Sequence, residues 1–176
     1  MKTRTLITAL VVASALTGCR GSDPTKDRLS SAPSPTGTAT DSAGTCTPTG
    51  KGTTDLTKKP VAAYGTGAEP TVTTLYDEVC GTGAEAVAGS NVEVKYVGLL
   101  FKGGTEFDSS WKRGDTFPFQ IGGQVVAGFS KGALGMKVGG RREVVIPSVD
   151  GYGPGGNGPI PGGATLIFLI DLVKVS

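Results

Sequence analysis

The sequence predicts an α+β domain, in which a twisted antiparallel sheet of about five strands wraps around one short helix. Several segments of the C-terminal two-thirds alternate apolar and polar residues, as half-buried strands do. Only one stretch has helical spacing, so no helix is available to connect parallel neighbours and the sheet should be antiparallel. The 29 glycines among 176 residues are about twice the average usage of ~7% and indicate many turns.

Five segments show the strand alternation. The last is the longest and has Leu166, Phe168, Ile170 and Leu172 on one face. The expected strands lie within residues 72–79, 92–101, 116–121, 142–146 and 166–172.

The expected helix covers Ala127–Met136, where Phe129, Ala133 and Met136 fall at positions i, i+4 and i+7. The stretch is short and contains three glycines. Most of its stability must therefore come from packing against the sheet.

The N-terminus has the pattern of a secretory signal peptide over residues 1–18. Lys2 and Arg4 precede an apolar run that is too short to span a bilayer as a stable helix. The run ends in Leu16-Thr17-Gly18-Cys19, which resembles a bacterial lipobox, although the cysteine of an ordinary signal peptide can fall there by chance. We expect Cys19 to be diacylated and to anchor an extracytoplasmic protein to the bacterial cell membrane.

Residues 19–66 are expected to form a tether. The stretch from Ser22 to Thr54 is dominated by Ser, Thr, Pro, Gly and Ala, with Leu29 as its only large aliphatic residue. It cannot bury enough surface to offset its ordering entropy. The first aromatic residue is Tyr64, so the folded domain is placed at residues 67–176.

Several kinds of chemistry are excluded by composition. The chain has no histidine, which removes Ser-His-Asp triads and imidazole ligands. The three cysteines form no CxxC pair, so neither a metal nor a cofactor is expected. Outside the cytoplasm Cys46 and Cys80 should form a disulfide, with two unpaired thiols as the alternative. Residues 68–176 carry nine basic and eleven acidic side chains, which argues against nucleic acid as a partner.

Nine of the eleven aromatic residues lie between Tyr96 and Phe168. They can be the core of a β-rich domain, or the lining of an apolar cleft for a small hydrophobic ligand. Five segments of this region, in order over residues 81–175, resemble the FKBP-type peptidyl-prolyl isomerases. They are Val94–Gly98, Phe107–Ser110, Gly123–Phe129, Gly151–Gly153 and Ile160–Phe168.

The resemblance implies a hydrophobic pocket between the sheet and the helix. Phe129 would form its floor, where the family usually has tryptophan, while the sole tryptophan, Trp111, is expected in a loop. The Val126 amide and the Tyr152 hydroxyl would donate to substrate carbonyls, and Asp108 would accept from Tyr96, held by Arg113, unless it is only a turn or capping residue. The implied catalytic residues are Tyr96, Phe107, Asp108, Phe117, Val126, Phe129, Tyr152 and Phe168, and the implied substrate-binding residues are Arg113, Gln124, Val125 and Ile160.

The chemistry implied by the resemblance suits a chain without histidine. Rotation about an X–Pro bond needs neither a nucleophile nor a proton transfer, but it must cross a barrier of ~18–20 kcal/mol. The expected partners are X–Pro segments of exported proteins, with macrolides such as tacrolimus or rapamycin in the same pocket, and the chain is expected to act as a monomer. A catalytically weak binding or chaperone module is the alternative.

Overall fold

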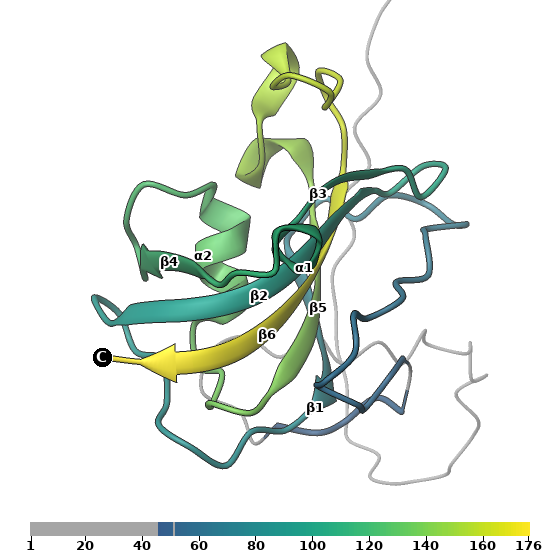
Figure 1. The fold of residues 1–176 in the computed structure, drawn as a ribbon. Coiled ribbons are helices and arrows are strands. Elements are labelled where there is room, and N and C mark those ends of the chain that lie inside the picture. Colours follow the sequence, from purple (N-terminus) through teal and green to yellow (C-terminus); the bar gives the residue numbers. More distant parts are fainter. Residues whose placement is uncertain (1–45, 51) are drawn as a thin grey trace, which may run out of the picture. The chain divides into compact units, whose positions relative to one another are not determined.

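The computed structural model describes residues 46–50 and 52–176, so the predicted signal peptide, Cys19 and the first part of the tether lie outside the described residues. The described chain forms a six-stranded antiparallel sheet in the order β1-β5-β6-β2-β3, with β4 also paired to β2 (Figure 1). The elements are β1 (Thr74–Val79), β2 (Asn91–Leu100), β3 (Glu106–Ser109), α1 (Ser110–Arg113), β4 (Phe117–Gln120), α2 (Ala127–Ala133), β5 (Arg141–Ile146), the 3-10 turns η1 (Ser148–Asp150) and η2 (Gly153–Gly155), and β6 (Leu166–Val175).

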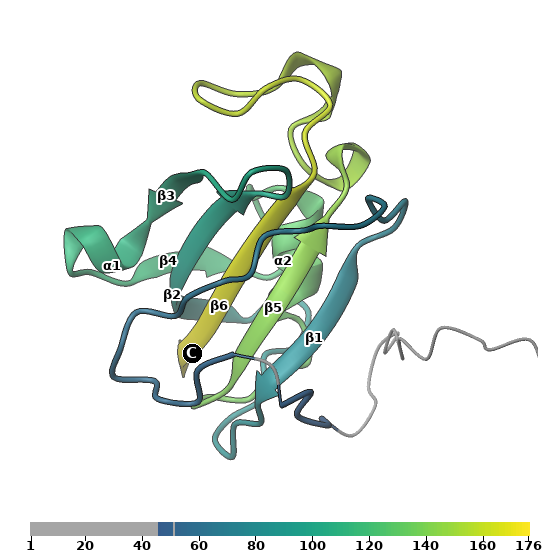
Figure 2. The same cartoon turned by 90° about the vertical axis from the view of Figure 1, so that its right-hand side faces the viewer.

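The two ten-residue strands β2 and β6 form the centre of the sheet. They pair from Val92 opposite Val175 to Leu100 opposite Leu166. Figure 2 shows them side by side with β5 and β1, while α2 lies behind the sheet. The predicted α+β class and antiparallel pairing are confirmed.

The sixth strand is β3, which the sequence did not predict. It shares one edge of β2 with β4: β3 pairs with Val97–Leu99, and β4 pairs with the start of β2. Phe107 is the only apolar residue of β3, so this strand has no alternation that could be recognised. The first strand was expected within residues 72–79, and β1 begins at Thr74, two residues after the start of that range.

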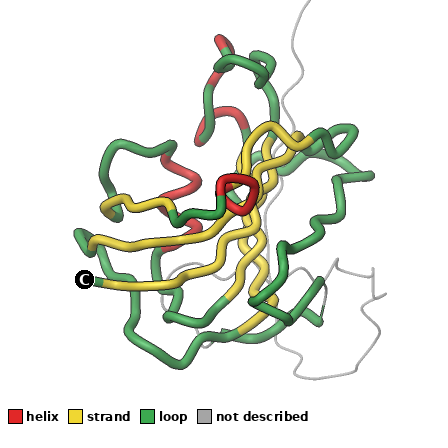
Figure 3. The backbone as a smooth tube through the Cα atoms, in the orientation of Figure 1, coloured by secondary structure: helices red, strands yellow, loops and turns green. Residues whose placement is uncertain are grey.

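Helix α2 ends at Ala133, three residues before the predicted end at Met136. Gly135 adopts a left-handed backbone with φ of 75°, which ends the helix and still leaves Met136 buried. Gly132 lets the helix lie close to the sheet, because a Cβ there would be 2.6 Å from the Val144 side chain. In Figure 3 the helices are short interruptions in a chain of strands and loops.

The main core lies between α2 and the inner face of the sheet. Its buried members include Tyr96 and Phe168 of the central strands and Phe129 of α2. Together with Ile160, four of the predicted pocket residues therefore belong to the core itself.

The outer face of the sheet is covered by residues 52–66, which we call the strap (Figure 2). Ala62 packs against Phe101, Val145 and Ile167. The Gly65 amide donates to the Phe101 carbonyl at 3.0 Å. These contacts are made by residues before position 67, where the sequence analysis places the start of the folded domain.

Arg141 fixes the strap to the sheet. Its fully buried guanidinium donates to the carbonyls of Thr53 at 2.6 Å and Lys58 at 3.2 Å. It also forms a two-fold ion pair with Asp171, at 2.5 and 2.7 Å. The strap thus supplies acceptors that this buried charge needs.

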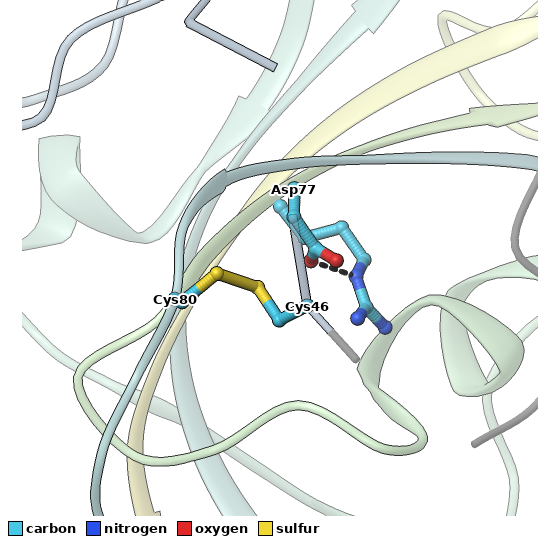
Figure 4. Close-up of a disulfide and its surroundings, with 4 residues drawn as sticks. Cys46, Asp77 and Cys80 are labelled. Carbon is cyan, nitrogen blue, oxygen red and sulfur yellow. Dashed lines mark hydrogen bonds and ion pairs between the residues drawn. A yellow bond between two sulfur atoms is a disulfide. The ribbon is translucent and has the colours of Figure 1, made fainter. Parts of the chain in front are cut away.

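A disulfide joins Cys46 to Cys80, with 5.8 Å between the Cα atoms (Figure 4). Close by, Asp77 accepts a hydrogen bond from Nε of Arg142 at 2.6 Å. The bridge ties the chain just before the strap to the end of β1. Among the described residues, no helix is long and apolar enough to cross a membrane.

Candidate functional site

The candidate site is built around the ring of Phe129, which α2 presents to the sheet. Four aromatic rings surround it with centroid distances of 5.0 to 6.2 Å, mostly edge to face. They belong to Tyr96, Phe117, Phe119 and Phe168. These edge-to-face contacts stabilise the cluster beyond the burial of its area and fix each ring.

Phe107 extends the cluster at the edge of the sheet. Its centroid lies 5.5 Å from that of Phe168. Gly98 makes this contact possible, because a Cβ at this position would be 2.7 Å from the Phe107 ring and 2.8 Å from the Phe168 ring. Gly98 lies in the motif Val94–Gly98, but the sequence alone did not indicate that it makes room for two rings.

Three polar side chains meet at the rim of the aromatic cluster. The Tyr96 hydroxyl donates to Oδ2 of Asp108 in a short hydrogen bond. Arg113 donates to Oδ1 of Asp108 at 2.6 Å and to the Tyr96 oxygen at 3.2 Å. The predicted set of Tyr96, Asp108 and Arg113 is therefore brought together by β2, β3 and α1.

The protonation states of this trio are fixed over a wide pH range. Burial raises the pKa of Tyr96 to about 12, and the hydrogen bond to Asp108 adds to this effect. Partial burial tends to raise the pKa of Asp108, but the hydrogen bonds from Tyr96, Arg113 and the Ser109 amide outweigh it and hold the pKa below 3.8. At neutral pH the trio is a neutral phenol, a carboxylate and a guanidinium.

Asp108 does not cap a helix. The N-cap of α1 is Ser109, which makes no side-chain capping bond, and Asp108 lies within β3. Ser110, the first residue of α1, contributes to the site instead, because its hydroxyl accepts a hydrogen bond from the Tyr96 amide at 3.0 Å. Ser110 thereby supports the backbone beneath the Tyr96 ring.

Two hydrogen-bond donors at the site have no acceptor within the described part of the chain. The Val126 amide precedes the first turn of α2, and the Tyr152 hydroxyl lies between η1 and η2. Both residues pack against the core cluster. They are available to carbonyl groups of a bound peptide.

The remaining predicted residues lie on the same side of the sheet. Val125 is half-buried against the core cluster and Ile160 is buried in it, held by reciprocal backbone bonds with Asn157. Gln124 is exposed on the turn before α2. Among the described residues, no group of acidic or cysteine side chains can hold a metal ion.

A comparison with known protein families decides the identity. The sequence profile of the FKBP-type peptidyl-prolyl cis-trans isomerases matches residues 83–173. This chain belongs to that family. Its activity is the cis-trans isomerisation of X–Pro peptide bonds, for which an apolar pocket without a nucleophile is sufficient.

Relatives support the family over most of the folded chain. A probable FK506-binding protein of Corynebacterium glutamicum is 47% identical over 117 residues, which are 66% of this chain and 98% of that protein. An FK506-binding protein of Streptomyces anulatus is 47% identical over 121 residues, 67% of this chain and 98% of that protein.

Solved structures agree with the fold. The crystal structure of AtFKBP13 matches with a TM-score of 0.56 and 35% identity, over 61% of this chain and 96% of that chain. FkpA from Escherichia coli matches with a TM-score of 0.55 and 34% identity, over 59% of this chain and 48% of that chain.

The sole tryptophan does not replace the family's usual floor residue. Trp111 lies in α1, which the sequence had placed in a loop, and the Lys95 ammonium lies 4.3 Å from its ring centre. No ring of the cluster around Phe129 contacts it within the described residues. The floor of this isomerase is therefore a phenylalanine held by four other rings.

Proposed function

We propose that this isomerase acts on exported proteins from a lipid anchor, and that it stabilises the twisted X–Pro amide in the aromatic pocket around Phe129. The observation that carries the catalytic part of this proposal is the ring cluster, bordered on one side by Tyr96, Asp108 and Arg113. It combines an apolar floor with a polar trio whose Tyr96 and Asp108 do not change protonation near neutral pH.

The pocket accelerates rotation by favouring the twisted amide. A planar amide is stabilised by charge separation between oxygen and nitrogen, which rotation removes. An apolar site therefore binds the twisted form better than the planar form, and only such differential binding raises the rate. In our proposal the proline ring rests on Phe129, with Tyr96, Phe107, Phe117 and Phe168 as walls.

Hydrogen bonds orient the peptide around this ring. The Val126 amide and the Tyr152 hydroxyl donate to carbonyl groups on either side of the rotating bond. Asp108 keeps the Tyr96 ring in place, and Arg113 balances the carboxylate charge. Arg113, Gln124, Val125 and Ile160 bound the surface over which the peptide passes.

Export and anchoring rest on other parts of the chain. Leu16-Thr17-Gly18-Cys19 has the lipobox pattern, and Cys46 and Cys80 form a disulfide of a kind that persists in oxidising compartments. We include in the proposal that the chain acts as a monomer. Since the names of two relatives describe FK506 binding, we extend the proposal to macrolides such as tacrolimus and rapamycin.

The catalytic proposal is tested by NMR exchange on short X–Pro peptides with the purified full-length chain. We expect faster cis-trans exchange, blocked by tacrolimus or rapamycin and reduced in Phe168→Ala. Leu56→Ala, in the strap, is the control. Exchange equal to the buffer blank with a folded sample would contradict the proposal and favour a binding or chaperone module.

The anchoring proposal is tested by cell fractionation. The natural chain is expected in the membrane fraction with labelled fatty acid attached, and Cys19→Ala should abolish the label. Ser22→Ala, three residues away, is the control. Release of the unaltered chain into the medium without acylation would contradict a lipid anchor.

A further inference from the structure

A hollow lies beside the aromatic cluster of the candidate site. Its volume is about 360 Å³, within the range of ~300–1,000 Å³ for small-molecule sites. One face of α2 forms a wall with Ala127, Ser130 and Lys131, and Leu134 directly after the helix extends this wall. On the other face Gly128, Phe129 and Gly132 are buried against the core. The loop before β2 and the turn after β4 complete it with Ala88, Ile121, Gly122, Gly123 and Val125.

The hollow borders the candidate active site. Val125 lines the hollow and also packs against the core cluster that contains Phe129. Ala127 lines it as well, so both chain neighbours of Val126 belong to its wall. A peptide that accepts a hydrogen bond from the Val126 amide therefore passes within one residue of the hollow.

The lining selects an uncharged occupant. Among the described residues that line the hollow, Lys131 alone is charged, and its ammonium is bound to both carboxylate oxygens of Asp150, at 3.0 and 2.9 Å. The Ser130 hydroxyl already accepts the Gly122 amide at 2.7 Å. The rest of the lining is aliphatic or glycine, so apolar contact is the main interaction on offer.

Exposed apolar side chains flank the hollow. Leu134 is 37% exposed on its wall, and Val87, next to Ala88, is 54% exposed. The Gly135 amide donates to the Ala86 carbonyl at 2.8 Å, which holds these two segments together. Clustered apolar surface next to an active site is typical of a docking surface.

We propose that the hollow is a second subsite of the isomerase, which binds an aliphatic side chain of the client two to four residues from the proline. An extended peptide advances about 3.3 Å per residue, so such a side chain lies roughly 7–13 Å along the peptide from the proline. The inference rests on the proposed binding of the peptide at Val126. It adds a sequence preference that the proline pocket alone does not give.

The experiment uses the full-length chain and a set of peptides with one X–Pro bond. Each peptide has leucine at one of the four positions on either side of that bond and serine at the others, and a reference peptide has serine at all of these positions. Catalysed exchange at low peptide concentration gives kcat/KM, and amide chemical shifts report contact with Ala88 and Leu134. At one position we expect leucine to raise kcat/KM roughly tenfold, the lower end of the discrimination given by one apolar contact.

Two variants change the hollow in opposite ways. Ala88→Trp fills it, and Leu134→Gln makes its wall polar. Both should abolish the leucine preference and leave the all-serine peptide unaffected. Ala68→Trp, an exposed alanine outside the hollow, is the matched control and should retain the preference.

The outcomes separate this inference from the proposed function. Absence of a leucine preference, or its survival in both variants, would overturn the subsite. If no peptide is isomerised, the proposed function fails. Leucine-dependent chemical shifts at Ala88 and Leu134 would in that case still establish the subsite, and their absence would refute it. Self-association that is lost in Ala88→Trp, without peptide shifts, would assign the hollow to a second copy of the chain and overturn the proposal.

Discussion

The hydroxyl of Tyr96 donates to the carboxylate of Asp108, across the edge where β2 and β3 pair. The same carboxylate accepts from Arg113 at 2.6 Å and from the Ser109 amide at 2.7 Å. A single acidic side chain thus fixes a wall of the pocket and places a negative charge at its rim.

Asp108→Asn should lower kcat/KM for X–Pro exchange about tenfold, because a hydrogen bond to a charged group contributes roughly 1.5–3 kcal/mol and ~1.4 kcal/mol corresponds to tenfold in rate. Tyr96→Phe keeps the ring and should cost less. In the double variant the loss of transition-state stabilisation should be smaller than the sum of the two single losses, since the two residues share one hydrogen bond. Full additivity in this cycle would show that the contact does not couple the two residues.

The pH profile of the reaction follows from the same trio. The pKa of Asp108 lies below 3.8 and that of Tyr96 at about 12, so neither group changes charge near neutrality. We expect kcat/KM to stay constant between about pH 5 and 9 and to fall only as acid protonates Asp108. A midpoint near pH 7, measured with a folded sample, would contradict this assignment.

Removal of the strap should destabilise the domain without changing its pocket. A chain that starts at residue 67 leaves the buried Arg141 without the carbonyls of Thr53 and Lys58 and uncovers Phe101 and Ile167. We expect a loss of at least roughly 3 kcal/mol relative to a chain that starts at residue 46, because two or more hydrogen bonds from a charged donor are lost. Both chains carry Cys80→Ser, and the longer one also carries Cys46→Ser, so that the disulfide does not contribute to the difference. Urea unfolding gives the comparison, and equal midpoints would show that the strap contributes nothing.

The disulfide should stabilise the fold and leave catalysis unchanged. Cys46 and Cys80 are separated by 34 positions, for which chain entropy gives about 3–4 kcal/mol as an upper figure. Double substitution to serine should lower the melting temperature, while exchange rates of the folded enzyme stay the same. In protein exported by its native host, denaturing non-reducing conditions should leave both cysteines unlabelled by thiol reagents, and labelling of both would refute the bridge.

Glu78 should make the stability of the domain depend on pH. Its side chain is buried beneath the strap, and burial raises its pKa from 4.5 to about 7, with Glu143 acting in the same direction and Arg141 against it. The folded state then holds a proton that the unfolded state has lost, so its stabilising contribution is complete below about pH 4.5 and disappears as the pH rises through about 7.

Glu78→Gln removes this dependence. The variant should be more stable than the natural chain at pH 8, by roughly 2–3 kcal/mol at most, and nearly equal to it at pH 4.5. Glu85→Gln, at an exposed position, is the control. Urea unfolding at both pH values tests this, and a constant difference between the variant and the natural chain would contradict the protonation of Glu78.

The strap shows why part of the fold escaped prediction. Strand alternation identified the inner residues of β2, β5 and β6, but Val97, Val145, Ile167 and Leu169 on the opposite face are buried as well. A sheet with two apolar faces needs a cover on each side. This signal was present in the sequence, although composition alone had assigned residues 52–66 to the tether.

The sequence by itself determined the elements whose apolar residues recur at a regular spacing, and it determined the order of the family motifs. Periodicity is a local property, so it located the long strands and α2, and the motifs located Tyr96, Asp108, Phe129 and Phe168. Only the tertiary structure decided that β3 pairs with β2, that Asp108 bonds Tyr96 rather than capping α1, and that Arg141 binds the strap. These contacts join residues distant in the chain, and their free energy exists only once the sheet has brought the partners together.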